Sequence, residues 1–177
     1  HELSIWMRVR KDARKPVVEG DTITYPGVRP HVDLVYTVAT DGIKGSLILS
    51  RPIGKARFRF GITSPTLSVI QDRDGQLRFV DSTGRTVWRL APLFMVDAAG
   101  AVSTAVSATW DAKNQVLVIE ADEKWIRDKA RVFPIRIDPS LELEPGLLGV
   151  QPYWSYWTYE LDDLGEFQVN LATGNLV

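Results

Sequence analysis

The feature that most limits the fold of this chain is a two-residue alternation of apolar and polar side chains. It is clearest in residues 5–9, 57–62 and 76–79, where apolar side chains occupy every second position. Successive side chains of a β-strand point to opposite faces of a sheet, so this pattern predicts strands with one buried face. Turn sequences such as Asp74-Gly75 separate the runs at short intervals. The sequence therefore predicts an all-β fold, an antiparallel β-sandwich-like domain with one short helix.

The clearest local element is a hairpin over residues 34–49, which contains the sequence Asp41-Gly42. Both residues tolerate the positive φ angles of a tight type I′ turn. A two-residue loop at this point predicts that Tyr36 lies opposite Leu47 and that Leu34 lies opposite Leu49.

Further strands are expected near residues 86–90, 93–97, 101–110, 115–121 and 132–137. Pro134 interrupts the last of these runs and has no N–H to donate, which predicts a strand at a sheet edge or a bulge. The one helix is expected after Asp122, whose side chain suits an N-cap.

The chain divides into three parts on this interpretation. Residues 1–138 form the antiparallel β-domain, and residues 139–150 form a linker that is marked by Pro139 and Pro145-Gly146. Residues 151–177 hold an aromatic segment, followed by an alternating run that predicts another strand. Because the chain begins at His1 and ends inside that run, we expect it to be a piece of a longer protein.

The aromatic segment contains the candidate contact residues of this chain, which are Tyr153, Trp154, Tyr156, Trp157 and Tyr159. A flat row of such rings can stack on sugars or bind a partner chain. In strand conformation, however, the rings fall on both faces, which favours burial between two layers. Both interpretations stay open at this point.

Composition narrows the classes of function. The chain has 22 acidic and 21 basic residues, without the basic excess of a module that binds nucleic acid. It has no apolar run of the roughly 20 residues that a membrane-spanning helix needs. It also has no cysteine, which removes disulfides, thiolate metal sites and thiol nucleophiles.

The motifs that resemble chemical sites have simpler explanations. His31 is the only internal histidine and is expected in a loop. The run from Asp72 to Gly75 opens like a calcium loop, but it lacks the distal acidic ligand and suits a hairpin turn. The run from Asp81 to Gly84 is also expected to be a turn. We therefore predict no catalytic residue, no metal ligand and no cofactor; a hydrolase with a hidden carboxylate pair is a third and weaker hypothesis.

Several segments, taken in order, resemble a known bacterial family. They are Ile23–Val28, Asp33–Tyr36 and Asp41–Lys44, then Arg131–Pro139, and finally Tyr153–Trp157 with Val169–Val177. Over about residues 20–177 the chain resembles the N-terminal region of secreted RHS or YD-repeat proteins of the wall-associated, polymorphic-toxin type, just before their repeats.

The resemblance implies a role without catalysis. Repeats of this kind build a β-shell that encloses or displays a C-terminal effector, and the segment before them would cap or present that shell. On this basis the last residues of the chain would be the first strands of the shell, and the partner would be the downstream repeat region of the same polypeptide. The implied location is secreted or at the cell surface. The alternative is a module that binds carbohydrate or cell-wall glycan through the aromatic residues.

Overall fold

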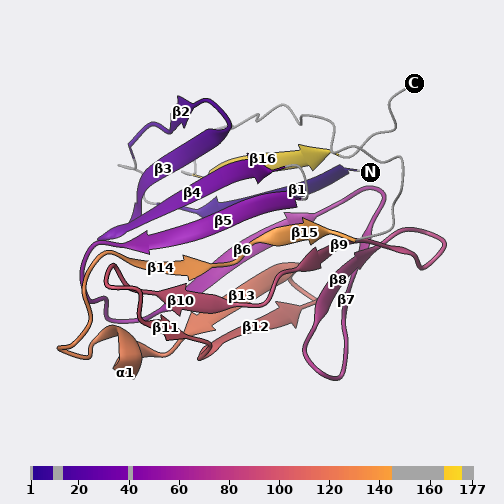
Figure 1. The fold of residues 1–177 in the computed structure, drawn as a ribbon. Helices are drawn as coiled ribbons and strands as arrows, with labels where there is room; N and C mark the ends of the chain where they lie inside the picture. The colour runs from indigo at the N-terminus through magenta and orange to yellow at the C-terminus, as the bar shows by residue number, and fades with distance from the viewer. Residues whose placement is uncertain (1, 10–13, 40–41, 145–165, 173–177) are drawn as a thin grey trace.

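The computed structural model describes residues 2–9, 14–39, 42–144 and 166–172, and its elements are drawn in Figure 1. Within these ranges the chain forms sixteen strands and one four-residue helix, which confirms the all-β prediction. The elements are β1 (Glu2–Arg8), β2 (Val17–Glu19), β3 (Thr22–Arg29), β4 (Val32–Ala39), β5 (Gly42–Leu49), β6 (Arg57–Thr63), β7 (Ser68–Gln71), β8 (Leu77–Val80), β9 (Thr86–Leu90), β10 (Phe94–Val96), β11 (Val102–Ser103), β12 (Val106–Asp111), β13 (Val116–Ala121), α1 (Glu123–Ile126), β14 (Ile135–Asp138), β15 (Leu141–Leu143) and β16 (Glu166–Ala172).

The strands form two antiparallel sheets. The first has five strands in the order β12-β13-β6-β1-β16. The second has eleven strands, with β11-β10-β14-β5-β15-β9-β8-β7 along one path and β4, β3 and β2 added from β5. Figure 1 shows β3, β4 and β5 running side by side, and β16 lying along β1.

One apolar core joins the two sheets. Alternate residues of β1, β6 and β13 point into it from the smaller sheet, and those of β3, β4, β5 and β14 do so from the larger one. Trp88, Phe58 and Phe79 are the largest of its fully buried side chains. Burial of an aromatic or aliphatic side chain contributes on the order of 2–3 kcal/mol, so this shared core is the main source of stability.

The β4–β5 hairpin forms as predicted, but its register differs by two positions. Leu34 pairs with Leu47, and Gly42 is the first residue of β5 instead of a turn residue. A shift of two keeps every side chain on its predicted face, because the side-chain period of a strand is two. Gly42 is needed for another reason: a Cβ atom there would clash with the carbonyl oxygen of Leu141 in β15.

The expected edge position of the strand after Pro134 is wrong. β14 begins at Ile135, immediately after the proline, and pairs with both β10 and β5. Because Pro134 precedes the strand, its missing N–H removes no hydrogen bond from the ladder.

Part of the expected linker belongs to the larger sheet. Leu141 pairs with Ile43 of β5 and with Leu90 of β9, and it is only 4% exposed. Ser140 is also buried, and its Oγ accepts a hydrogen bond from Gly45 N at 3.1 Å. The β-domain therefore continues past residue 138. The predicted strand after the aromatic segment is present as β16, and it joins the smaller sheet through β1.

Helix α1 confirms the prediction at Asp122, whose Oδ1 accepts a hydrogen bond from Lys124 N at 2.9 Å. No helix in the described ranges has the length and apolar character that crossing a lipid bilayer requires.

Candidate functional site

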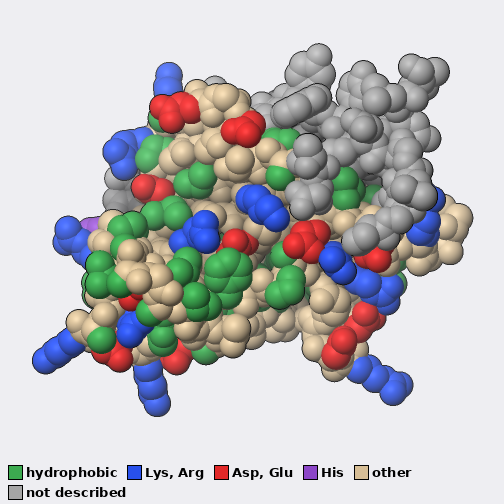
Figure 2. All heavy atoms as spheres, viewed as in Figure 1, with side chains coloured by type: hydrophobic (Ala, Val, Ile, Leu, Met, Phe, Trp, Pro, Cys, Tyr) green, Lys and Arg blue, Asp and Glu red, His purple; other side chains and the backbone are tan. Residues whose placement is uncertain are grey.

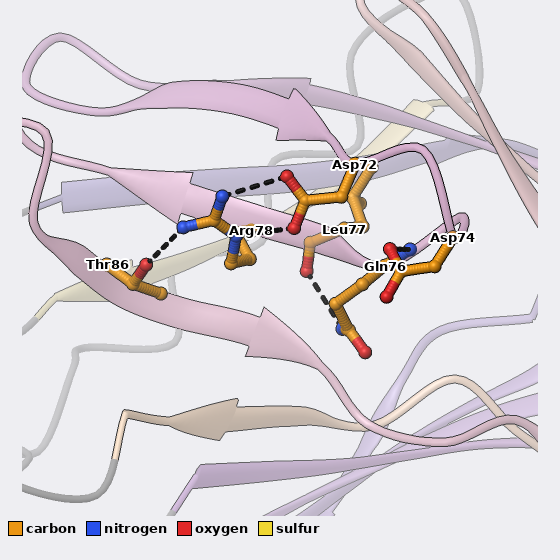
Figure 3. Close-up of polar contacts among 6 residues, drawn as sticks. All are labelled: Asp72, Asp74, Gln76, Leu77, Arg78 and Thr86. Atoms are coloured by element: carbon orange, nitrogen blue, oxygen red, sulfur yellow. Dashed lines mark hydrogen bonds and ion pairs between the residues drawn. The ribbon is translucent and has the colours of Figure 1, made fainter.

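The calcium-like run over residues 72–75 is a turn, as Figure 3 shows. The guanidinium of Arg78 donates from Nε and Nη2 to the two carboxylate oxygens of Asp72, at 2.9 and 2.8 Å. This hydrogen bonding lowers the pKa of Asp72. Gly75 has a φ of 87°, which suits a tight turn. The carboxylate of Asp72 thus orders a hairpin, and the described residues contain no cluster of three or more potential metal ligands.

The other two motifs also have structural roles. Asp81 accepts hydrogen bonds from Thr83 Oγ1 at 2.6 Å and from Thr83 N at 2.9 Å. The hydrogen bond from the Thr83 side chain is the main cause of the lowered pKa of Asp81. His31 is exposed, has a φ of 66° and lies in the turn between β3 and β4. The predictions of a turn and a loop histidine are confirmed.

Asp97 forms the most deeply buried ion pair of the described residues. Its side chain is 1% exposed and lies 3.2 Å from Arg131 Nη1. Burial acts to raise its pKa, but hydrogen bonds from the backbone N–H groups of Ala101, Val132 and Ala99 and the charge of Arg131 together lower it. These bonds join the turn after β10 to the segment before β14, so the pair is structural.

The predicted contact residues of the aromatic segment, Tyr153 to Tyr159, lie outside the described residues. Their role in packing or in binding therefore stays a prediction.

The described part instead contains a cleft of about 660 Å³ beside the point where β1 leaves β6. The end of β1, the start of β6, the turn after β3 and the turn before β13 enclose it. In Figure 2, acidic and basic side chains are interspersed over the drawn face of the molecule. The described residues that line the cleft differ, because they include four arginines and no Asp or Glu: Arg8, Arg29, Arg57 and Arg59.

Two of these arginines are held by their neighbours. Arg29 donates from Nη1 to the carbonyl oxygen of Arg57 at 2.6 Å, and its guanidinium lies 5.3 Å from the centre of the Phe58 ring. Arg57 also forms a half-exposed ion pair with Glu120 at 3.3 Å. Asp111 stands near Arg59, whose charge helps to lower the pKa of that carboxyl, although hydrogen bonds from Asn114 are the larger cause. Among the described side chains, the cleft lining is therefore cationic, and the acidic groups near it, Glu120 and Asp111, lie outside that lining.

An indole ring forms one wall of the cleft. Trp6 lies on the outer face of β1 and covers Gly61 of β6, where any Cβ atom would clash with the ring. Chemically, the site offers guanidinium donors for anionic groups and an apolar surface beside them. The sequence alone does not indicate this cleft, because the four arginines are scattered along the chain, and three of them, Arg8, Arg57 and Arg59, fit the polar positions of alternating strands.

Fold and cleft together define an all-β domain of two antiparallel sheets with an arginine-lined cleft. Over 134 residues the chain is 31% identical to the tRNA nuclease WapA of Bacillus subtilis strain 168. The same identity relates it to the tRNA3(Ser)-specific nuclease WapA of Bacillus spizizenii and to the tRNA(Glu)-specific nuclease WapA of Bacillus subtilis subsp. natto.

The aligned region covers 71% of this chain but 6% of each relative, so the chain corresponds to a small part of those proteins. The chain is thus a distant homologue of one segment of the WapA nucleases. No family model matches it, and no solved structure does.

Proposed function

We propose that this chain is a non-catalytic structural module of a large secreted RHS/YD-repeat protein, in which it caps or presents the repeat shell around a C-terminal effector. The family resemblance of its motifs and its similarity to one segment of the WapA nucleases support this role. The carboxylates of the two motifs that resembled chemical sites support it too, because Asp72 and Asp81 order turns.

The observation that carries the proposal is the position of β16. Among the described strands it pairs only with β1, along Glu166–Ala172, and it stands at one end of the five-stranded sheet. An edge strand presents N–H and C=O groups to which another strand can add. The resemblance assigns the first repeat strands to this part of the chain. We infer that the repeat shell continues the smaller sheet from β16.

Hydrogen exchange tests this inference directly. The chain alone is compared with a longer one that includes the repeats following it in the natural protein. The amides of residues 166–172 are expected to exchange at least about tenfold more slowly in the longer chain, since pairing on the second edge suppresses local opening. Strand β7, at the far end of the other sheet, serves as the control and should not change. Equal exchange of β16 in the two chains would contradict the proposal.

A second measurement tests the absence of catalysis. The isolated chain is expected to leave tRNA intact under conditions in which the WapA nuclease of Bacillus subtilis cleaves it. Deletion of residues 1–144 from the full-length protein should leave the activity of its C-terminal effector unchanged but make the repeats more sensitive to protease. Cleavage of tRNA by the isolated chain would show that the proposed role is wrong.

A further inference from the structure

The cleft between β1 and β6 contains an open strand edge. β1 pairs with β6 only over Ser4–Trp6, opposite Gly61–Thr63. β6 nevertheless begins four residues earlier, at Arg57, and on its other side it is paired with β13 along its length. Residues 57–60 therefore have no ladder partner on the β1 side among the described residues, and the cleft lies at this edge.

The hydrogen-bonding groups of this edge can be assigned from the register. Ile62 N donates to Gln115 O across the β6–β13 ladder at 2.9 Å. In an antiparallel ladder, alternate residues direct their N–H and C=O groups to opposite sides of the strand. Arg57 and Arg59 consequently direct theirs toward the cleft. The carbonyl oxygen of Arg57 already accepts a hydrogen bond from Arg29. An added strand would therefore form its hydrogen bonds with the N–H and C=O groups of Arg59.

The side chains along the edge alternate in a matching way. Arg57 and Arg59 are exposed on the outer face, whereas Phe58 between them points into the core. In a strand that adds here, every second side chain would lie on the outer face beside Arg57 and Arg59. The side chains between them would lie on the apolar face, to which Phe58 points. Arg8 and Arg29 line the same cleft.

We propose that this cleft binds an extended peptide segment in which acidic residues alternate with apolar ones, by adding it as a strand beside β6. Carboxylates pair with guanidinium groups through two parallel hydrogen bonds, which provides charge recognition. Main-chain hydrogen bonds to the strand edge provide the rest of the affinity. An anionic wall polymer would use the arginines but could not use the peptide groups of β6, and for this reason the open edge favours a peptide. This inference goes beyond the proposed structural role and does not depend on it.

The test uses a fluorescently labelled synthetic peptide in which glutamate alternates with valine, and fluorescence anisotropy as the readout. The whole chain is expected to bind it, and Arg59→Gln should weaken binding about tenfold, the value of one charge-assisted pair. The matched control is Arg85→Gln, because Arg85 is an exposed arginine in the turn between β8 and β9, paired with Asp81. That variant should bind like the parent, and melting curves should show that both variants are folded.

Two altered peptides distinguish recognition of the peptide's charge from its addition as a strand. A peptide with glutamine in place of glutamate should not bind, and one with N-methyl groups on alternate amides should bind at least about tenfold more weakly, because it loses ladder hydrogen bonds. Equal binding of the N-methylated peptide would overturn strand addition. If Arg59→Gln and Arg85→Gln changed the peptide affinity equally, the peptide would not bind at this cleft. Tighter binding of a polyphosphate chain, with the same dependence on Arg59, would show that the cleft takes an anionic polymer and that the peptide proposal is wrong.

Discussion

Leu141→Ala provides a sharp test of the strand that replaced part of the expected linker. Leu141 is 4% exposed and pairs with Ile43 and Leu90. Removing three carbon atoms loses about 0.8 kcal/mol each in transfer free energy, or roughly 2.4 kcal/mol in total. A small cavity of about 20 Å³ already adjoins this side chain, and the new space would enlarge it. A cavity contribution therefore adds to the loss, and we expect the free energy of unfolding to fall by about 3 kcal/mol.

The assay is urea unfolding, supported by thermal melting of the whole chain. For a domain of this size about 1 kcal/mol corresponds to 2–4 °C, so the melting temperature should fall by roughly 6–12 °C. Val102→Ala is the control, because Val102 is an aliphatic strand residue that is 61% exposed. If Leu141 lay in an exposed linker, its substitution by alanine would change the free energy of unfolding by no more than about 0.5 kcal/mol. If the two variants unfold alike, the placement of β15 between β5 and β9 is refuted.

Three further predictions concern other parts of the chain. The double variant Trp154→Ala/Trp157→Ala is expected to melt lower and resist protease less, since each buried indole contributes about 2–3 kcal/mol; unchanged melting would exclude the packing interpretation. Gly61→Ala should cost about 1–3 kcal/mol through its clash with Trp6, and this cost should disappear in a Trp6→Ala background in a double-mutant cycle of urea unfolding. Folding lowers the pKa of the Asp97 carboxyl, so its ionised form stabilises the folded state at pH values above the unfolded pKa of about 3.9. This stabilisation is lost as the pH falls through the lower folded pKa. Asp97→Asn should thus be less stable than the parent at pH 7 in urea, and its stability should change less between pH 5 and pH 2.

Local sequence was sufficient to predict the fold class and the positions of most individual strands. The alternation of Phe58 and Phe60 with arginines, the Asp-Gly turn at Asp74, and the N-cap at Asp122 each depend on interactions within a few residues. Such interactions operate in any context, and therefore the same elements appear in the structure.

Register and position within the sheets were decided by distant contacts. The Asp41-Gly42 sequence predicts a turn at Gly42. In the structure a glycine is required there because the backbone of Leu141, about a hundred positions later in the chain, lies against it. Pro134 could not be placed by itself, because whether it interrupts a ladder depends on where β14 begins. The three residues of β15 are too few to show a period, and only β5 and β9 make them a strand.

The sequence by itself determined that this protein is built from antiparallel strands with one buried face, because the two-residue period indicates half-buried strands and the short turns between them join neighbours as hairpins. Only the tertiary structure decided that Arg8, Arg29, Arg57 and Arg59 meet at one open strand edge. Their separation along the chain gives no local signal. The cleft arises where β1 diverges from β6, and that divergence depends on how the two sheets pack around their common core.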